Sequence, residues 1–282
     1  MQGSSRASAA HGQRALDALL AGGPGRAVEP AALADDLFGV CGALESSAAL
    51  RRALTDPTRE ASAKGELVRR LFADKVGAPA VQLVTSVVGQ RWSTERDLVD
   101  TVEDFAVQAL ASGALARGGA DAVEDELSRL GRTVAGPPSL RDAATDRRAT
   151  PAARAEVIQA LLAGKAQPET LRLARQAVLG ARGRRFDRVI AGYLAIIATR
   201  REQLSATVTS AIDLDADQSQ RLAAALTRIY GKPVHLKVVL DPQIVGGIRV
   251  QIGDEVEADI RGKLLKAKVT KPVFARNGKA VI

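Results

Sequence analysis

Side chains able to carry acid–base, metal or nucleophilic chemistry are few and scattered in this sequence. It contains two histidines, His11 and His235, which lie far apart along the chain, and a single cysteine, Cys41. His235 falls on the outward side of an expected strand, which predicts a surface position rather than a metal-binding or proton-transferring role. Cys41 has no basic neighbour that would favour its thiolate, so we interpret it as a small core residue.

Motifs for phosphate and metal binding are incomplete. Every Gly-Lys pair lacks the earlier glycine that a phosphate-binding loop requires. Asp213, Asp215 and Asp217 resemble the start of a calcium-binding loop, but Gln218 stands where that loop needs glycine, and Ala224 where it needs glutamate. We therefore expect no catalytic residue, no metal site and no cofactor.

Charge gives the next indication of function. The formal net charge of +8 and the isoelectric point of about 10.0 would suit a protein that binds nucleic acid or an anionic membrane surface. The distribution is uneven, however. Residues 91–126 carry three basic and nine acidic side chains, whereas residues 137–202 carry thirteen basic and six acidic ones. Such alternating stretches favour a module that docks onto other proteins.

A cluster of arginines keeps the nucleic-acid alternative open, because guanidinium groups could contact phosphates. Phe186 is the only aromatic residue among them, and the stacking side chains typical of single-strand binders are scarce. We prefer a solvated loop between helices, or a patch that faces an acidic partner. The cluster consists of Arg182, Arg184, Arg185 and Arg188.

Composition predicts a mostly helical chain. Hydrophobic residues make up 46% and aromatic residues only 3%, so the core must be built from small aliphatic side chains, which suit closely packed helices. No apolar run is long enough to predict a transmembrane helix. A single cysteine cannot form a disulfide within the chain, which fits a protein of the cytoplasm. The first thirty residues faintly resemble a transit peptide, but we expect a frayed lead-in to a helix at 11–21.

An internal repeat is the strongest sign of domain organisation. Residues 50–99 and 140–189 share fourteen identities without a gap. Amphipathic helices rich in alanine and leucine can resemble one another by chance, but a common register over this length favours duplication. We therefore expect two copies of a helical bundle, residues 1–110 and 95–202, that share one long helix.

Caps and apolar spacing predict the helices of each copy. Thr150 is a good N-cap and Pro151 suits the first helical position. Two further helices of the second copy are expected from Pro168 and around 186–201. The helices expected in the first copy cover 11–21, 61–72, 79–88 and 95–110.

After residue 202 the apolar period changes from helical to alternating, which predicts strands. The first strand is expected at 204–212. A helix follows, with Asp215 as its N-cap and Gln218 as the capping-box partner. Further strands are expected at 234–240 and 248–252.

The predicted fold class is therefore α+β and multidomain. Two helical copies precede a small α/β domain at 203–268 with about three strands and a last short helix near 260–268. A basic tail at 269–282 follows.

A glycine-rich run at 241–254, DPQIVGGIRVQIGD, carries a family resemblance. Gly246 and Gly247 permit a bulge or a close backbone approach, and Gly253 with Asp254 suits a tight turn. Together with the GKPV run at 231–234, this segment resembles the delta subunit of F-type ATP synthases, a relative of the mitochondrial oligomycin sensitivity conferral protein. The extra helical copy resembles the longer delta subunits of high-GC Gram-positive bacteria.

The resemblance implies a non-catalytic stator subunit. Such a subunit would form a hetero-oligomer with N-terminal segments of the alpha subunits and with the C-terminal helix of the b subunit. It would bind no nucleic acid, and it would lie at the cytoplasmic face of the plasma membrane only through the complex.

The resemblance also places a groove for an alpha-subunit helix between the first and fifth helices of a bundle. In the first copy this groove would be lined by residues that are equally good core residues. They are Leu16, Leu19, Leu20, Val84 and Val88.

Overall fold

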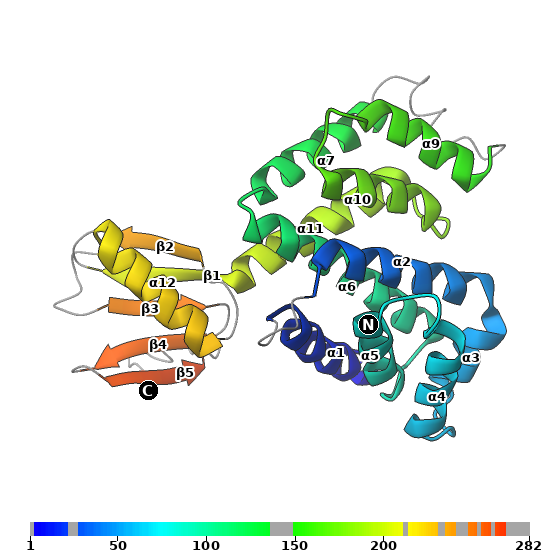
Figure 1. The fold of residues 1–282 in the computed structure, drawn as a ribbon, viewed down its shortest axis with the longest axis horizontal. Helices are drawn as coiled ribbons and strands as arrows, with labels where there is room; N and C mark the ends of the chain where they lie inside the picture. The colour runs from blue at the N-terminus through cyan, green and yellow to red at the C-terminus, as the bar shows by residue number, and fades with distance from the viewer. Residues whose placement is uncertain are drawn as a thin grey trace, which may run out of the picture. The chain divides into compact units, whose positions relative to one another are not determined.

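The computed structural model separates into two compact units, residues 1–200 and residues 201–282. Each unit is described by itself. The structure describes residues 3–21, 28–135, 149–210, 214–230, 235–240, 248–252, 255–260 and 263–268. The first unit is helical and the second combines a helix with a sheet (Figure 1).

The helical unit begins with six helices whose bounds the structure gives as follows. They are α1 (Gly3–Ala21), α2 (Pro30–Ser46), α3 (Ala48–Thr55), α4 (Ala61–Phe72), α5 (Ala78–Val88) and α6 (Glu95–Ala116). The chain then continues through α7 (Ala120–Ala135), α9 (Pro151–Leu162), α10 (Pro168–Leu179) and α11 (Phe186–Leu204). The expectation of a mostly helical chain is confirmed.

Local capping chemistry sets several of these helix starts. The hydroxyl oxygens of Ser47, Thr94 and Thr150 each accept a hydrogen bond from a backbone N–H of the first helical turn, at 3.1–3.2 Å. This satisfies donors that have no partner within the helix. Pro151 and Pro168 occupy the first helical position, where the missing N–H costs nothing. The predicted cap at Thr150 is confirmed.

Helix α6 is the central element of this unit. Most of its apolar side chains are buried, and α2 and α1 pack along it (Figure 1). Gly12 of α1 allows the closest approach. A Cβ atom built there would lie 2.7 Å from the Phe105 ring and 2.9 Å from the side chain of Val87. The core of the unit is therefore built on small residues as well as on leucine and valine.

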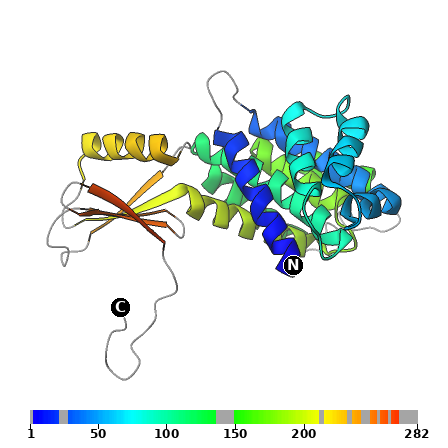
Figure 2. The same cartoon turned by 90° about the horizontal axis from the view of Figure 1, so that it is seen from below.

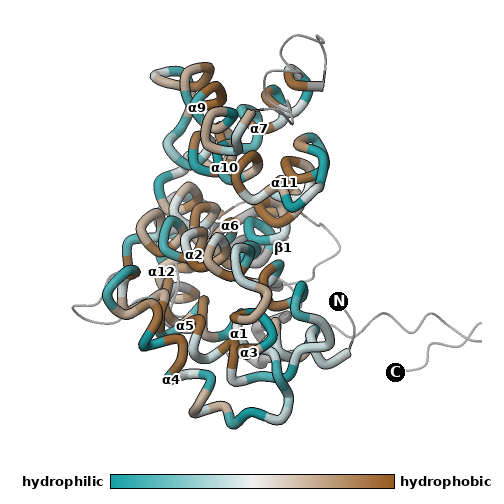
Figure 3. Tube along the Cα trace, turned by 90° about the vertical axis from the view of Figure 1, so that its right-hand side faces the viewer, coloured by the Kyte–Doolittle hydropathy of each residue, from teal (hydrophilic) through white to brown (hydrophobic). Residues whose placement is uncertain are grey.

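After α6, helix α10 packs against both α7 and α9, and it also contacts α2 and α6 (Figure 1). Apolar and polar residues alternate along the helix traces (Figure 3). This is the pattern of helices that each bury one stripe.

The second unit holds strands β1 (Ser205–Ser210), β2 (His235–Leu240), β3 (Ile248–Ile252), β4 (Glu255–Ile260) and β5 (Lys263–Lys268) and helix α12 (Ala216–Tyr230). The sheet order is β2-β1-β3-β4-β5; β1 and β2 are parallel and the other pairs antiparallel. Helix α12 lies over one face of this sheet (Figure 2). Its Leu226 packs with Val208 and Val250 in a small core.

The capping box predicted for α12 is confirmed. The backbone N–H of Gln218 donates to the Asp215 carboxylate at 2.7 Å, and the Asp215 N–H donates to the Gln218 side-chain oxygen at 3.1 Å. These reciprocal bonds fix the helix start.

Two local predictions are wrong. Of the segment expected as a short helix near 260–268, Ile260 ends β4 and residues 263–268 form β5, so the sheet of the described residues has five strands rather than about three. Antiparallel backbone pairing between β4 and β5 decides the conformation there. The expected frayed lead-in is also wrong, because α1 begins at Gly3 and packs against α5 and α6.

The close approach at Gly12 gives a first testable prediction. Gly12→Ala should lower the free energy of unfolding by roughly 1–3 kcal/mol, because the added methyl group overpacks the contact with Phe105. Gly39→Ala in α2 is the matched control, since a Cβ there meets nothing within 4 Å. The control should be neutral or stabilising by about 0.5–1 kcal/mol. Chemical denaturation of the full chain measures both variants, and equal effects would contradict the packing argument.

Candidate partner-binding surfaces

The five residues expected to line a helix-binding groove divide into two groups in the structure. Leu16 of α1 and Val84 and Val88 of α5 are at most 1% exposed and belong to the core where α1 packs against α5. Leu19 and Leu20 are half-buried near the end of α1. Of these five residues, only the two leucines therefore keep accessible apolar surface.

The four residues of the glycine-rich signature, Gly246, Gly247, Gly253 and Asp254, lie outside the described residues.

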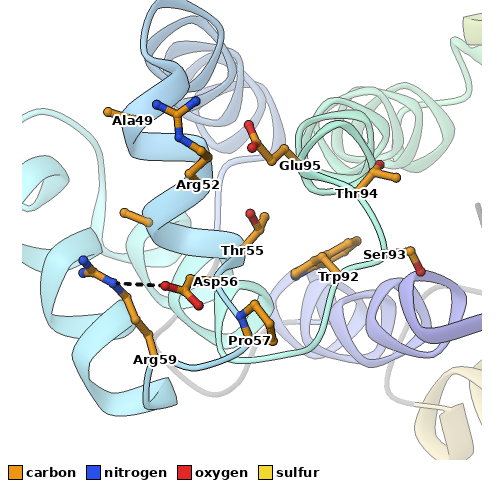
Figure 4. A pocket seen from close by; sticks show the side chains of 11 residues that line it. Ala49, Arg52, Thr55, Asp56, Pro57, Arg59, Trp92, Ser93, Thr94 and Glu95 are labelled. Atoms are coloured by element: carbon orange, nitrogen blue, oxygen red, sulfur yellow. Dashed lines mark ion pairs between the residues drawn. The ribbon is translucent and has the colours of Figure 1, made fainter.

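A shallow groove of about 760 Å³ lies between the turn after α3 and the turn before α6 (Figure 4). Trp92 forms part of its wall and donates its indole N–H to the Val87 carbonyl at 3.0 Å. Thr58 donates to the Asp56 carboxylate from its hydroxyl and from its backbone N–H, and these bonds lower the pKa of Asp56. The sequence analysis did not find this groove, although the chain's single tryptophan marks it.

The polar groups around this groove are largely engaged with one another. Arg59 pairs with Asp56 at 3.8 Å, as Figure 4 shows. Glu95 pairs with Arg51 at 3.5 Å, and the Thr94 hydroxyl caps α6. No nucleophile with an adjacent base is among the lining residues. The arrangement suits contact with another protein better than chemistry.

The arginine cluster occupies two different environments. Arg182 and Arg184 turn inward and pair with Glu103 of α6, whose residue is 2% exposed. Arg185, by contrast, is 78% exposed and pairs with Asp187 beside it. The interpretation of a solvated loop therefore fails for Arg182, since its side chain is 6% exposed. The acidic partner of these inward arginines is a residue of the same chain.

Glu103 is a buried charged residue that was not predicted from the sequence. Its carboxylate accepts hydrogen bonds from Arg184 at 2.9 Å and from the Tyr193 hydroxyl at 2.6 Å. Burial, together with the Glu103 charge, raises the pKa of Tyr193 well above its ordinary value. A carboxylate whose oxygens are occupied by these internal partners does not suit a general base, because it is not free to reach a substrate. The only available signal was a charged residue within an apolar helix stripe.

Cys41 lies beside this cluster on α2, in the wall of a second groove of about 620 Å³ between α2 and α10. Its thiol is buried and lies 3.8 Å from the Val99 carbonyl. Burial raises the pKa of the thiol, so the thiolate is disfavoured. The prediction that Cys41 is a core residue is confirmed.

Within the part of the chain that the structure describes, no three His, Cys, Asp or Glu side chains are grouped so as to hold a metal ion. In the same residues, no helix combines the length and the apolar character needed to cross a membrane.

Asp104 gives a prediction on pH. Burial, and then the charges of Glu103 and Asp100, raise the pKa of the Asp104 carboxyl from 3.8 to about 7. The folded state therefore holds this proton more tightly than the unfolded state. Stability contributed by the protonated carboxyl is present below pH 4 and is lost as the pH rises towards about 7.

Asp104→Asn should remove this dependence and should stabilise the chain more above pH 7 than near pH 4. Urea denaturation at several pH values measures the effect. Asp74→Asn, at an exposed position after α4, is the control and should leave the pH dependence of the wild-type chain intact. A pH profile shared by wild type and Asp104→Asn would contradict the assignment.

The comparisons with known proteins all indicate the same family. The family model for the ATP synthase delta (OSCP) subunit matches residues 104–269. The chain is 44% identical over 254 residues to ATP synthase subunit delta of Kineococcus radiotolerans, covering 90% of this chain and 91% of the relative. It is 45% identical to the Streptomyces avermitilis protein of the same name over 254 residues, with 90% and 92% coverage. The Thermobifida fusca protein is 38% identical over 269 residues, with 95% and 98% coverage.

The family match spans more than half of the chain, and these relatives are covered almost completely. The resemblance drawn from the glycine-rich run is thereby confirmed. The chain belongs to the ATP synthase delta (OSCP) subunit family, the non-catalytic peripheral-stalk component of the F-type ATP synthase.

Proposed function

We propose that this peripheral-stalk subunit joins N-terminal segments of the alpha subunits to the C-terminal helix of the b subunit, at the cytoplasmic face of the plasma membrane. The observation that carries the proposal is its membership of the delta family over nearly the whole chain. A rotary enzyme needs its catalytic head held against rotation, so a stator must bind two bodies and transmit force between them. The helical unit would bind the head and the second unit the stalk.

We also propose that the helical unit arose by duplication, in line with the repeat in the sequence. The helix starts support this. Helices α2, α4 and α5 begin at Pro30, Ala61 and Ala78. Helices α7, α9 and α10 each begin 90 residues later, at Ala120, Pro151 and Pro168.

A pair of equivalent hydrogen bonds gives a second line of support. The Asp36 carboxylate in α2 accepts from the backbone N–H of Gly77, the N-cap of α5, at 2.8 Å. At the same offset, Glu126 in α7 accepts from the backbone N–H of Gln167, the N-cap of α10, also at 2.8 Å. A contact between two helices that recurs at the sequence offset is hard to attribute to composition alone.

The α1 and α5 pair is the proposed site for one alpha-subunit helix. Leu19 and Leu20 supply the accessible apolar edge, while Leu16, Val84 and Val88 form the packed floor beneath it. An amphipathic helix would lay its apolar stripe along this edge. Because the floor residues also hold the fold together, a test must use the edge residues.

Several contacts of modest strength are enough to hold the joint. Once one segment is bound, each further segment binds at a raised effective concentration. An overall nanomolar affinity corresponds to about −12 kcal/mol, which two or three such contacts can supply together.

Leu20→Asp should weaken binding of an alpha-subunit N-terminal peptide by about tenfold or more, because it places a charge in the apolar edge. Leu71→Asp is the matched control, since Leu71 is a 37% exposed leucine on α4, away from α1. Isothermal titration calorimetry of the full chain measures both. Equal affinity for the two variants would remove this groove assignment.

The whole proposal is tested by isolating the tagged chain from membranes and asking whether the alpha and b subunits co-purify. The nucleic-acid alternative is tested by filter binding at graded salt. It predicts a steep loss of affinity as salt rises. The burial of Arg182 against Glu103 disfavours that alternative, because the guanidinium group of Arg182 is not available to phosphates.

A further inference from the structure

The helical unit is held together across its middle by charges of opposite sign. We call residues 3–116 the first half and residues 120–200 the second half. Among the ion pairs between them, Arg172 pairs with Asp35, Arg184 with Glu103, and Arg200 with Asp17. In each pair the arginine belongs to the second half and the carboxylate to the first. The basic stretch of the sequence thus pairs, in part, with the acidic residues of the same chain.

Arg182 makes the densest set of these contacts. Its guanidinium group pairs with Asp100 at 3.0 Å and Glu45 at 3.3 Å, and it also pairs with Glu103. The carboxylates come from α2 and α6, whereas Arg182 lies in the turn between α10 and α11. Burial opposes the charge, but these three carboxylates raise the pKa of Arg182 above its ordinary value. One side chain therefore ties this turn to two helices of the first half.

The backbone of Arg182 is held in an unfavourable conformation. Its φ angle is 50°, and it is the one non-glycine residue with positive φ within the described ranges. A side chain with a Cβ atom is strained in this region of φ, where glycine would be unstrained. The carbonyl of Arg182 accepts a hydrogen bond from the Arg96 guanidinium at 3.3 Å. The strain persists because the side chain and the carbonyl are both anchored to the first half.

Glu103 cannot easily lose this partner. It is buried, and its other contacts are Arg184 and Tyr193, which also come from the second half. Removing one partner of a buried ion pair leaves the other charge poorly compensated, and this costs far more than the loss of a surface pair. Of the other two pairs between the halves, Arg172 with Asp35 is largely exposed and adds little. The second pair joins Asp17 of α1 to Arg200, whose side chain is 2% exposed.

We infer that Arg182 makes the two helical halves one rigid body, because its buried guanidinium group binds carboxylates of both α2 and α6. The inference rests on the proposed stator function in one respect only. A rigid contact between the two halves serves a purpose if the subunit transmits force. Without the ion pairs of Arg182, the second half would move relative to the first half about the connection after α6.

The test measures the distance between the halves directly. Spin labels are attached in the full chain at Leu71→Cys in α4 and Val157→Cys in α9, two exposed positions. The buried Cys41 thiol should stay unlabelled. Arg182→Ala should broaden the distance distribution. The control Arg185→Ala should leave it narrow, because Arg185 pairs with Asp187, which lies in the same half.

Hydrogen exchange gives a second readout on the same variants. Arg182→Ala should speed exchange in α10, α11 and the end of α2 by roughly 100-fold, as expected for loss of a buried ion pair. Exchange in α4 and α5 should stay unchanged. A narrow distance distribution with wild-type exchange in Arg182→Ala would overturn the inference.

Arg182→Gly separates the ion pairs from the backbone strain. Glycine tolerates the positive φ but has no guanidinium group, so it should loosen the halves as much as alanine does. A glycine variant that keeps wild-type distances would show that the ion pairs of Arg182 do not hold the two halves together, and the inference would be wrong. Failure of the wild-type chain to bind alpha or b subunits would instead contradict the proposed function and would leave these distance measurements as they are.

Discussion

A buried carboxylate in the middle of α6 is the constraint on which the helical unit depends. An ionised glutamate among packed helices is very costly unless cations and donors surround it. For Glu103 these groups are Arg182, Arg184 and Tyr193, which lie 79 to 90 residues later in the chain. The turn between α10 and α11 must therefore lie against α6 for the fold to be stable. This requirement acts together with the other ion pairs between the halves and with the packing of α10 on α2 and α6.

The same constraint changes the meaning of the charge pattern. Acidic and basic stretches predicted a docking module, and part of that docking takes place within the chain itself. Within the described residues of the helical unit, the half-buried edge at Leu19 and Leu20 and the groove beside Trp92 lie outside these internal ion pairs. A stator that engages a head and a stalk benefits from such an arrangement, because charges that rigidify the subunit are kept inside while its outer surfaces serve for binding.

Sequence-based prediction succeeded where the physical cause is local. The cap at Thr150, the proline starts of α9 and α10, and the capping box of α12 all depend on residues within one helical turn. It failed at 260–268, where strand pairing decides the conformation, and at residues 3–10, where packing against α5 and α6 stabilises a polar helix start. The five groove residues share one helical pattern, which does not reveal which of them are enclosed.

By itself the sequence determined the helical character of the first 200 residues, the change to strands near residue 205, and the family through the glycine-rich run. These features follow from periodicity, capping and turn chemistry, which act over short distances. Only the tertiary structure decided that Arg182 is enclosed while Arg185 is exposed, and that Leu16 is core while Leu20 is accessible. Burial is a property of what packs on a residue from elsewhere in the chain, so neighbouring residues of the same type can have opposite roles.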